Sequence, residues 1–215
     1  MVGVVIHSRT SANPPTPLSQ VRSRLPAKLG GSHHERRVAA IGMKLFDLLA
    51  PRHGLSKKYR HLLHLAALIH DAGRVYGSEG HEHSGAAMVL ADRSLPLSPR
   101  QRRAIAYLVR YHRGGVPQLL SEQQILQVGD RHQKLRILLA ILRASDALDS
   151  RRLRPKAIII KRTAKKIRIT CLVRDELSKA KRRLGGCNKF TLLESEFALR
   201  VRLRIKREPT TVARS

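Results

Sequence analysis

One segment of the chain is apolar on almost every face of a predicted helix, and this feature constrains the fold most. Residues 57–72 carry Leu62, Leu63 and an unbroken apolar run over residues 65–69. A helix that is apolar nearly all round belongs inside a protein, where other elements cover it on several sides. The sequence therefore predicts a helical bundle with this segment at its centre and Gly73 as its C-terminal stop.

Further helices are predicted on both sides of this segment. Ser32 followed by Glu35 fits a helix-capping box, and Val38 and Ile41 then continue at helical spacing as far as Pro51. Helical periods recur over about residues 83–93, 98–113 and 131–150.

The period of the apolar residues changes after residue 155. Residues 157–161 and 167–173 have the character of strands, and residues 199–206 alternate strictly between apolar and basic side chains, as a half-buried strand does. Residues 175–184 and 190–197 look helical. The predicted fold class is mostly α, a helical bundle followed by a small α+β C-terminal domain.

These patterns divide the chain into four parts. Prolines and glycines keep the first 31 residues open, so residues 1–31 are expected to form a disordered basic arm. The helical domain then covers residues 32–152, the small basic α+β domain residues 153–207, and a short tail residues 208–215.

The charge of the chain is strongly positive, with 43 lysines and arginines against 15 aspartates and glutamates and a net charge of +28. Residues 1–150 hold 22 basic and 10 acidic residues, a net +12, and residues 151–215 hold 21 and 5, a net +16. A surface of this kind attracts polyanions, so we expect a polyphosphate, guanosine polyphosphate or RNA backbone as partner.

The sequence favours a cytoplasmic protein. Its two cysteines, Cys171 and Cys187, are too few for a disulfide framework. No stretch approaches the roughly 20 apolar residues that a membrane span needs. A homodimer is compatible with these features.

Several histidines and aspartates fall on apolar stripes of predicted helices, where a polar group is costly. Each alone could be a structural core residue, but together they favour a metal site. Asp71 adds a second argument, because a carboxylate in the last turn of a helix opposes the helix dipole unless a cation is near. Mixed imidazole and carboxylate ligands suit manganese, iron or magnesium in preference to zinc, and we expect one of these as cofactor. The five residues are His34, His70, Asp71, His112 and Asp146.

The order His…His-Asp…Asp is the pattern of the HD superfamily of metal-dependent phosphohydrolases, and the local strings narrow the match. Together they resemble the C-terminal HD-type domain of the exopolyphosphatase/guanosine pentaphosphate phosphohydrolase (Ppx/GppA) family over about residues 32–206. The strings are His34-Glu-Arg-Arg-Val-Ala, Leu45-Phe46-Asp47, His53-Gly-Leu, Ala66-Ala-Leu-Ile-His-Asp-Ala-Gly-Arg74, His81-Glu-His-Ser84, Arg110-Tyr-His-Arg113 and Ile141-Leu-Arg-Ala-Ser-Asp-Ala-Leu-Asp149.

The resemblance implies residue roles. The four HD metal ligands would be His34, His70, Asp71 and Asp146. Two further positions match the extra ligands of two-metal HD enzymes, namely His83 (or His81) and His112. The implied chemistry is attack of a metal-activated water on phosphorus. Three arginines flank these ligands and would either clamp phosphate or serve only as solvated surface charge: Arg74, Arg110 and Arg113.

The chain also departs from the family, because it would be a stand-alone C-terminal domain without the N-terminal actin-like domains that carry phosphohydrolysis there. Two functions therefore stay open. One is a metal-dependent phosphohydrolase acting on polyphosphate, guanosine polyphosphate or a related phosphate ester. The other is a non-catalytic polyphosphate- or RNA-binding module that works with a separate catalytic chain.

The last predicted strand is a candidate phosphate-binding surface. Its basic side chains share one face and have no aromatic neighbour on which a base could stack, so we expect contacts to phosphate without base readout. They are Arg200, Arg202, Arg204 and Lys206.

Overall fold

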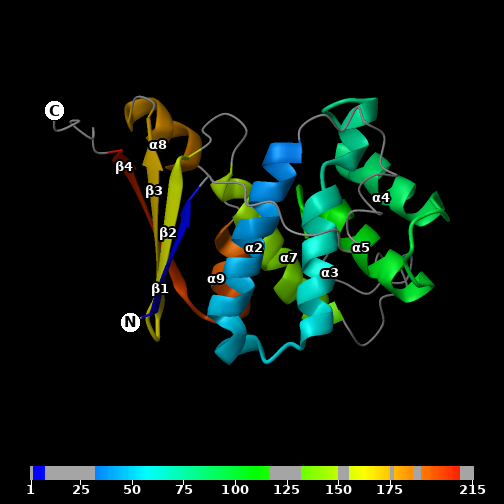
Figure 1. Ribbon diagram of the computed structural model, residues 1–215, viewed down its shortest axis with the longest axis horizontal. Coiled ribbons are helices and arrows are strands. Elements are labelled where there is room, and N and C mark those ends of the chain that lie inside the picture. The colour runs from blue at the N-terminus through cyan, green and yellow to red at the C-terminus, as the bar shows by residue number, and fades with distance from the viewer. Residues whose placement is uncertain are drawn as a thin grey trace, which may run out of the picture.

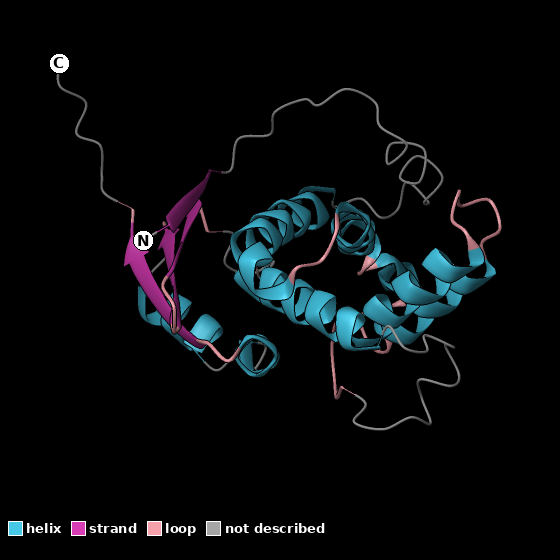
Figure 2. Cartoon of the chain, turned by 90° about the horizontal axis from the view of Figure 1, so that it is seen from below, coloured by secondary structure: helices cyan, strands magenta, loops and turns pink. Residues whose placement is uncertain are grey.

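The computed structural model in Figure 1 describes residues 2–7, 32–116, 132–149, 155–174, 177–185 and 190–208. It places a bundle of helices beside a small twisted sheet (Figures 1 and 2). The mostly helical fold class predicted from the sequence is confirmed. No helix in the described ranges is both long enough and apolar enough to cross a bilayer.

The apolar segment that opened the sequence analysis is the buried helix α3, and its neighbours pack around it as predicted. Leu63, Leu65 and Ala66 of α3 are almost completely buried. The helix α5 begins at a complete capping box between Ser98 and Gln101, with Pro99 in its first turn. The helices of the bundle are α2 (Ser32–His53), α3 (Lys57–Ile69), the 3-10 helix η2 (Ala72–Tyr76), α4 (His81–Ala91), α5 (Pro99–Tyr111) and α7 (His132–Leu148).

The sheet has four described strands in the order β1-β2-β3-β4. The pairs β1/β2 and β2/β3 are antiparallel, whereas β3 and β4 are parallel and are joined through two short helices. The elements are β1 (Val2–His7), β2 (Ala157–Arg162), β3 (Lys166–Val173), α8 (Leu177–Gly185), α9 (Thr191–Phe197) and β4 (Arg200–Arg207).

The strand β1 corrects one expectation. Residues 2–7, expected from the sequence to belong to a disordered arm, instead pair with β2 across the whole length of that strand. This short apolar segment is too brief to show the two-residue alternation of a strand, and the strand with which it pairs lies about 150 residues away in the sequence. Local sequence patterns therefore do not reveal β1. The rest of the expected arm, residues 1 and 8–31, and residues 209–215 of the tail lie outside the described residues.

The sheet packs on the bundle through the apolar half of its alternating residues. Ile160, Ile167 and Ile169 are fully buried, as the period of two requires. The helix α9 joins the two layers, because Glu196 of α9 accepts hydrogen bonds from Gln133 and Arg136 of α7. The basic half of the alternation is left on the opposite face of the sheet.

Candidate metal centre

Five helix ends meet at one point of the bundle and bring six buried polar side chains together. His34 lies in the first turn of α2 and His81 begins α4, while the other four side chains lie at or just beyond the C-terminal ends of α3, α5 and α7. Antiparallel packing places such opposite ends side by side. We call the six residues the His/Asp centre: His34, His70, Asp71, His81, His112 and Asp146.

Asp71 lies in the middle of the His/Asp centre. Its Oδ1 is 3.0 Å from Nε2 of His81 and 3.5 Å from Nε2 of His112. The same oxygen is 3.8 Å from Nε2 of His70, while Oδ2 is 3.8 Å from Nε2 of His34. The two oxygens of one carboxylate therefore face different histidines.

Asp146 faces the centre from α7. Its Oδ1 is 3.3 Å from Nε2 of His34 and 3.7 Å from Nε2 of His70. Two groups of three side chains have ligand atoms that all lie within 4.8 Å of one another, a spacing compatible with a bound ion. They are His34, His70 and Asp146, and His70, Asp71 and His112.

Three histidines of the centre hold their rings in the same way. In each, Nδ1 lies 2.7–2.8 Å from the backbone carbonyl three residues earlier, that of Ala67, Ser78 or Val109. A carbonyl can only accept, so Nδ1 carries the proton and Nε2 presents a lone pair. Backbone bonds of this kind fix the tautomer of metal-ligating histidines in many proteins. The three residues are His70, His81 and His112.

These Nε2 atoms have no hydrogen-bond partner, although they are buried. A buried lone pair without a donor is costly, and the carboxylates that these atoms face are themselves acceptors: Asp71 for His81 and His112, and Asp146 together with Asp71 for His70. A cation between the imidazoles and the carboxylate removes both costs. The residues present therefore fit a divalent metal ion.

The protonation states of Asp71 and His112 are those that metal ligands need. Burial alone would raise the pKa of Asp71, but the close contacts of its carboxylate with His112, His70 and Arg74 outweigh burial and hold that pKa well below its usual range. Burial lowers the pKa of His112, against the opposing effect of Asp71. Asp71 is thus ionised and His112 neutral at pH 7, which are the forms that bind metals.

The structure adds two residues that the sequence analysis did not select. Asp149 is almost fully buried, and its carboxylate accepts a hydrogen bond from Nδ1 of His34 at 3.0 Å. Arg37 donates through Nε to the other oxygen of Asp149 at 2.5 Å and also contacts the Pro155 carbonyl. The only sequence feature that could have indicated Asp149 is its position one helical turn after Asp146.

His81 and His83 are alternatives from the sequence, and the structure brings His81 to the centre. The side chain of His83 is 60% exposed and lies beside Glu82. The helix α4 begins at His81, two residues earlier than predicted, after Gly80 with a positive φ of 62°. This start places His81 at the end of the helix that meets the centre.

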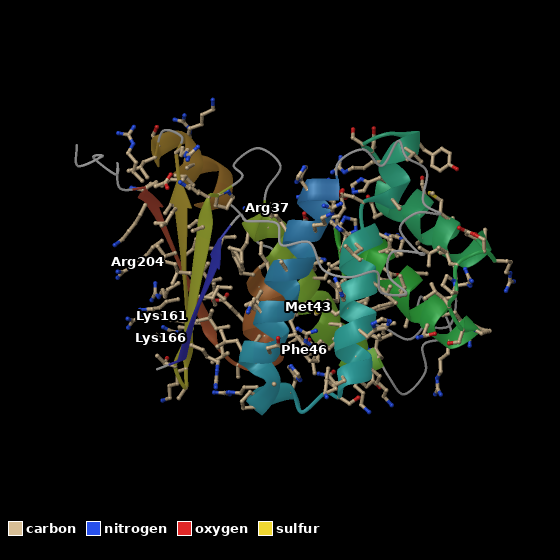
Figure 3. All side chains as sticks on the ribbon, in the orientation of Figure 1. Arg37, Met43, Phe46, Lys161, Lys166 and Arg204 are labelled. Carbon is tan, nitrogen blue, oxygen red and sulfur yellow. The ribbon has the colours of Figure 1, made fainter. Side chains whose placement is uncertain are left out.

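The basic residues expected to bind phosphate lie in different places. Arg74 donates through Nε to Oδ2 of Asp71 at 2.7 Å, so it contacts the centre directly. Arg110 lies over the ring of Tyr111, and Arg113 is exposed next to His112. The four basic residues of β4 instead lie on the exposed face of the sheet (Figure 3).

Comparison with known proteins agrees with this arrangement. The family model of Ppx/GppA phosphatase, domain III, matches residues 31–182, well over half of the chain. The matched part includes every element of the His/Asp centre and continues through β2 and β3. A search of curated proteins finds no match. The resemblance carried by the sequence motifs is confirmed, and the chain belongs to the Ppx/GppA phosphatase family over its domain III.

Proposed function

We propose that the protein is a metal-dependent phosphohydrolase with an HD-type active site at the His/Asp centre. The observation that carries the proposal is the set of three buried Nε2 lone pairs, on His70, His81 and His112, aimed at the ionised carboxylate of Asp71. Buried polar atoms without a hydrogen-bond partner are rare, and a bound cation would account for three of them at one point.

We propose that the donor set would hold two ions. The Nε2 of His70 has one lone pair and serves one ion only. Asp71 offers two oxygens that face different histidines and can serve two. We assign His34, His70 and Asp146 to one ion, His81 and His112 to a second, and Asp71 to both. A divalent ion bound here lowers the pKa of a coordinated water and neutralises charge on phosphoryl oxygens.

The protein's own groups orient this site. Asp149 holds the Nδ1 proton of His34, so that Nε2 of His34 faces Asp146. Arg74 is anchored by its Nε–H to Asp71, and its side chain stays 28% exposed. Its remaining N–H groups are therefore free to donate to a phosphoryl oxygen, and a guanidinium has the planar geometry for that contact.

The proposed substrates are polyphosphate, guanosine polyphosphates or related phosphate esters. The family to which the chain belongs is one of phosphatases, and a chain with a net charge of +28 attracts substrates of high negative charge. We propose manganese, iron or magnesium as the ion.

The test compares metal content and turnover in matched double variants. His70→Ala with Asp71→Ala removes two ligands, whereas His61→Ala with Glu79→Ala removes the same types of group from exposed positions. Metal content is measured by elemental mass spectrometry, and phosphate release with added manganese across a panel of phosphate esters and polyphosphate. We expect the first variant to lose both signals and the second to keep them. Equal metal content and turnover in the wild type and the first variant would refute the proposal.

A second candidate function is a non-catalytic module that binds a polyanion and works with a separate catalytic chain. The basic face of the sheet supports it, because the labelled cations Lys161, Lys166 and Arg204 point away from the helices that hold the His/Asp centre (Figure 3). This function predicts polyanion binding without phosphate release, and binding unchanged by the His70→Ala and Asp71→Ala substitutions.

A further inference from the structure

The exposed face of the sheet carries a cluster of cations, along β4 and on the adjoining ends of β2 and β3. Alternate residues of β2, β3 and β4 point away from the helices, as Lys161, Lys166 and Arg204 show in Figure 3. We call this surface the basic sheet face. Its seven exposed basic residues are Lys161, Lys166, Arg168, Arg200, Arg202, Arg204 and Lys206.

Strand register arranges these cations in two dimensions. Lys161 of β2 lies opposite Arg168 of β3, and Arg168 lies opposite Arg202 of β4, so that three cations form one row. Lys166 and Arg200 form a second row. Neighbouring strands are about 4.8 Å apart, and alternate residues along a strand about 6.6 Å. The positive charges therefore repeat both along the strands and across them on this face of the twisted sheet.

No described carboxylate neutralises this array. Glu208, at the end of β4, pairs with Lys156 and Arg174, which are not among the seven residues. Glu196 of α9 lies on the helical side of the sheet, where it pairs with Arg136 of α7. Like charges placed directly opposite one another in a sheet repel, so the basic sheet face is unfavourable until an anion covers it.

We propose that the basic sheet face binds the backbone of double-stranded RNA without reading its base sequence. The open face of a sheet fits the wide, shallow minor groove of an A-form helix, which displays phosphates and 2′-hydroxyls. The minor groove of B-form DNA is only about 6 Å wide, which is too narrow to admit the face of a sheet. The described positions of the face carry no aromatic side chain, whereas single-strand binding without sequence preference relies on base stacking.

The spacing of the cations also favours RNA over inorganic polyphosphate. Neighbouring phosphorus atoms in polyphosphate are joined by one oxygen and lie closer together than alternate residues of a strand. Phosphodiesters are separated by a sugar, and their larger spacing matches that of Arg200, Arg202 and Arg204 along β4.

The surface is separate from the proposed active site. In Figure 1 the helix α2 lies between the sheet and α3, and the buried isoleucines of β2 and β3 fill the inner side of the sheet. A long RNA bound on the outer face therefore does not need to enter the His/Asp centre.

The test removes one row of cations and compares it with a matched change elsewhere. The row variant is Lys161→Gln, Arg168→Gln and Arg202→Gln. The control variant is Lys44→Gln, Arg93→Gln and Arg100→Gln, which removes one lysine and two arginines from exposed positions of the bundle. Binding to a fluorescent RNA hairpin with a stem of about 20 base pairs is measured by anisotropy over a range of salt concentrations. Circular dichroism checks that both variants fold.

The expected effect follows from counterion release. Each phosphate contact releases roughly 0.7 to 0.9 of a counterion, so loss of three contacts lowers affinity at about 0.1 M salt by about 100-fold or more. The slope of log affinity against log salt becomes shallower by about 2. We expect the control variant to stay within about threefold of the wild type, and a second hairpin of unrelated sequence to bind equally well.

Three results would overturn the proposal. One is equal weakening by the row and control variants, which would mean that only net charge matters. Another is wild-type affinity in the row variant. The third is stronger competition from long-chain polyphosphate than from unlabelled hairpin RNA at equal phosphate concentration, which would identify the face as a polyphosphate site.

Discussion

Substitution of Asp149 by asparagine tests how the His/Asp centre is oriented. The change keeps the size of the side chain but removes the charge that accepts hydrogen bonds from His34 and Arg37. An asparagine amide that donates to Nδ1 of His34 moves the imidazole proton to Nε2, the atom that faces Asp146. A protonated Nε2 cannot bind a metal ion.

The expected magnitudes come from burial. The side chain of Asp149 is 2% exposed and that of Arg37 is 24% exposed. In the Asp149→Asn variant the Arg37 guanidinium loses its carboxylate partner, and water can replace the lost hydrogen bond only in part. Hydrogen bonds to charged groups contribute about 1.5–3 kcal/mol each, and we expect a loss of about 3 kcal/mol in the free energy of unfolding. At roughly 2–4 °C per kcal/mol, the melting temperature falls by about 6–12 °C. Loss of a hydrogen-bonding partner of a metal ligand lowers metal affinity by about 10–100-fold.

The assays are thermal unfolding followed by circular dichroism and manganese titration by calorimetry. Asp47→Asn is the matched control, because Asp47 also pairs with an arginine, Arg60, but both side chains are at least 40% exposed. Exposed pairs contribute about 0–1 kcal/mol, so the control loses little stability and no metal affinity. Wild-type manganese affinity in a folded Asp149→Asn variant would refute the assigned role of Asp149.

Two further predictions concern the packing of the molecule. A Cβ on Gly73 would lie 2.0 Å from the His81 carbonyl oxygen, so Gly73→Ala forces α4 away from the centre. We expect the free energy of unfolding, measured in urea, to fall by about 3 kcal/mol or more. A fall of less than about 1 kcal/mol would contradict the close packing of Gly73 against α4. Burial raises the pKa of the Cys171 thiol to about 12, whereas an unfolded thiol ionises near pH 8.5. The unfolded chain therefore releases this proton first, and stability falls by about 1.4 kcal/mol per pH unit between about pH 8.5 and 12. Urea unfolding of the wild type and Cys171→Ala at several pH values measures this difference, and parallel pH profiles of the two proteins would be incompatible with it.

The sequence predicted those features whose signals are local. The apolar period of α3 predicted both its central position and the placement of His70 and Asp71 at its end, because burial on all sides leaves few positions for a polar group. The alternation of β4 predicted its exposed basic face in the same way.

Features that depend on distant pairing were not predictable from local patterns. The contact of Asp149 with His34 and Arg37 spans more than 110 residues, and no spacing rule relates such positions. The choice between His81 and His83 depended on where α4 begins, and the positive φ of Gly80 that sets this start has no certain signature in sequence.

The pairing of β1 with β2 also has a consequence for the order of folding. The strands β2 and β3 are joined by a short turn, whereas β1 reaches its partner only after closure of a loop of about 150 residues, and the entropy cost of closure grows with loop length. We expect β1 to join the sheet last, which pulsed hydrogen exchange would detect as late protection of its amides. Until then the backbone edge of β2 is open to strands of other chains, and refolding at high protein concentration should favour aggregation at this step.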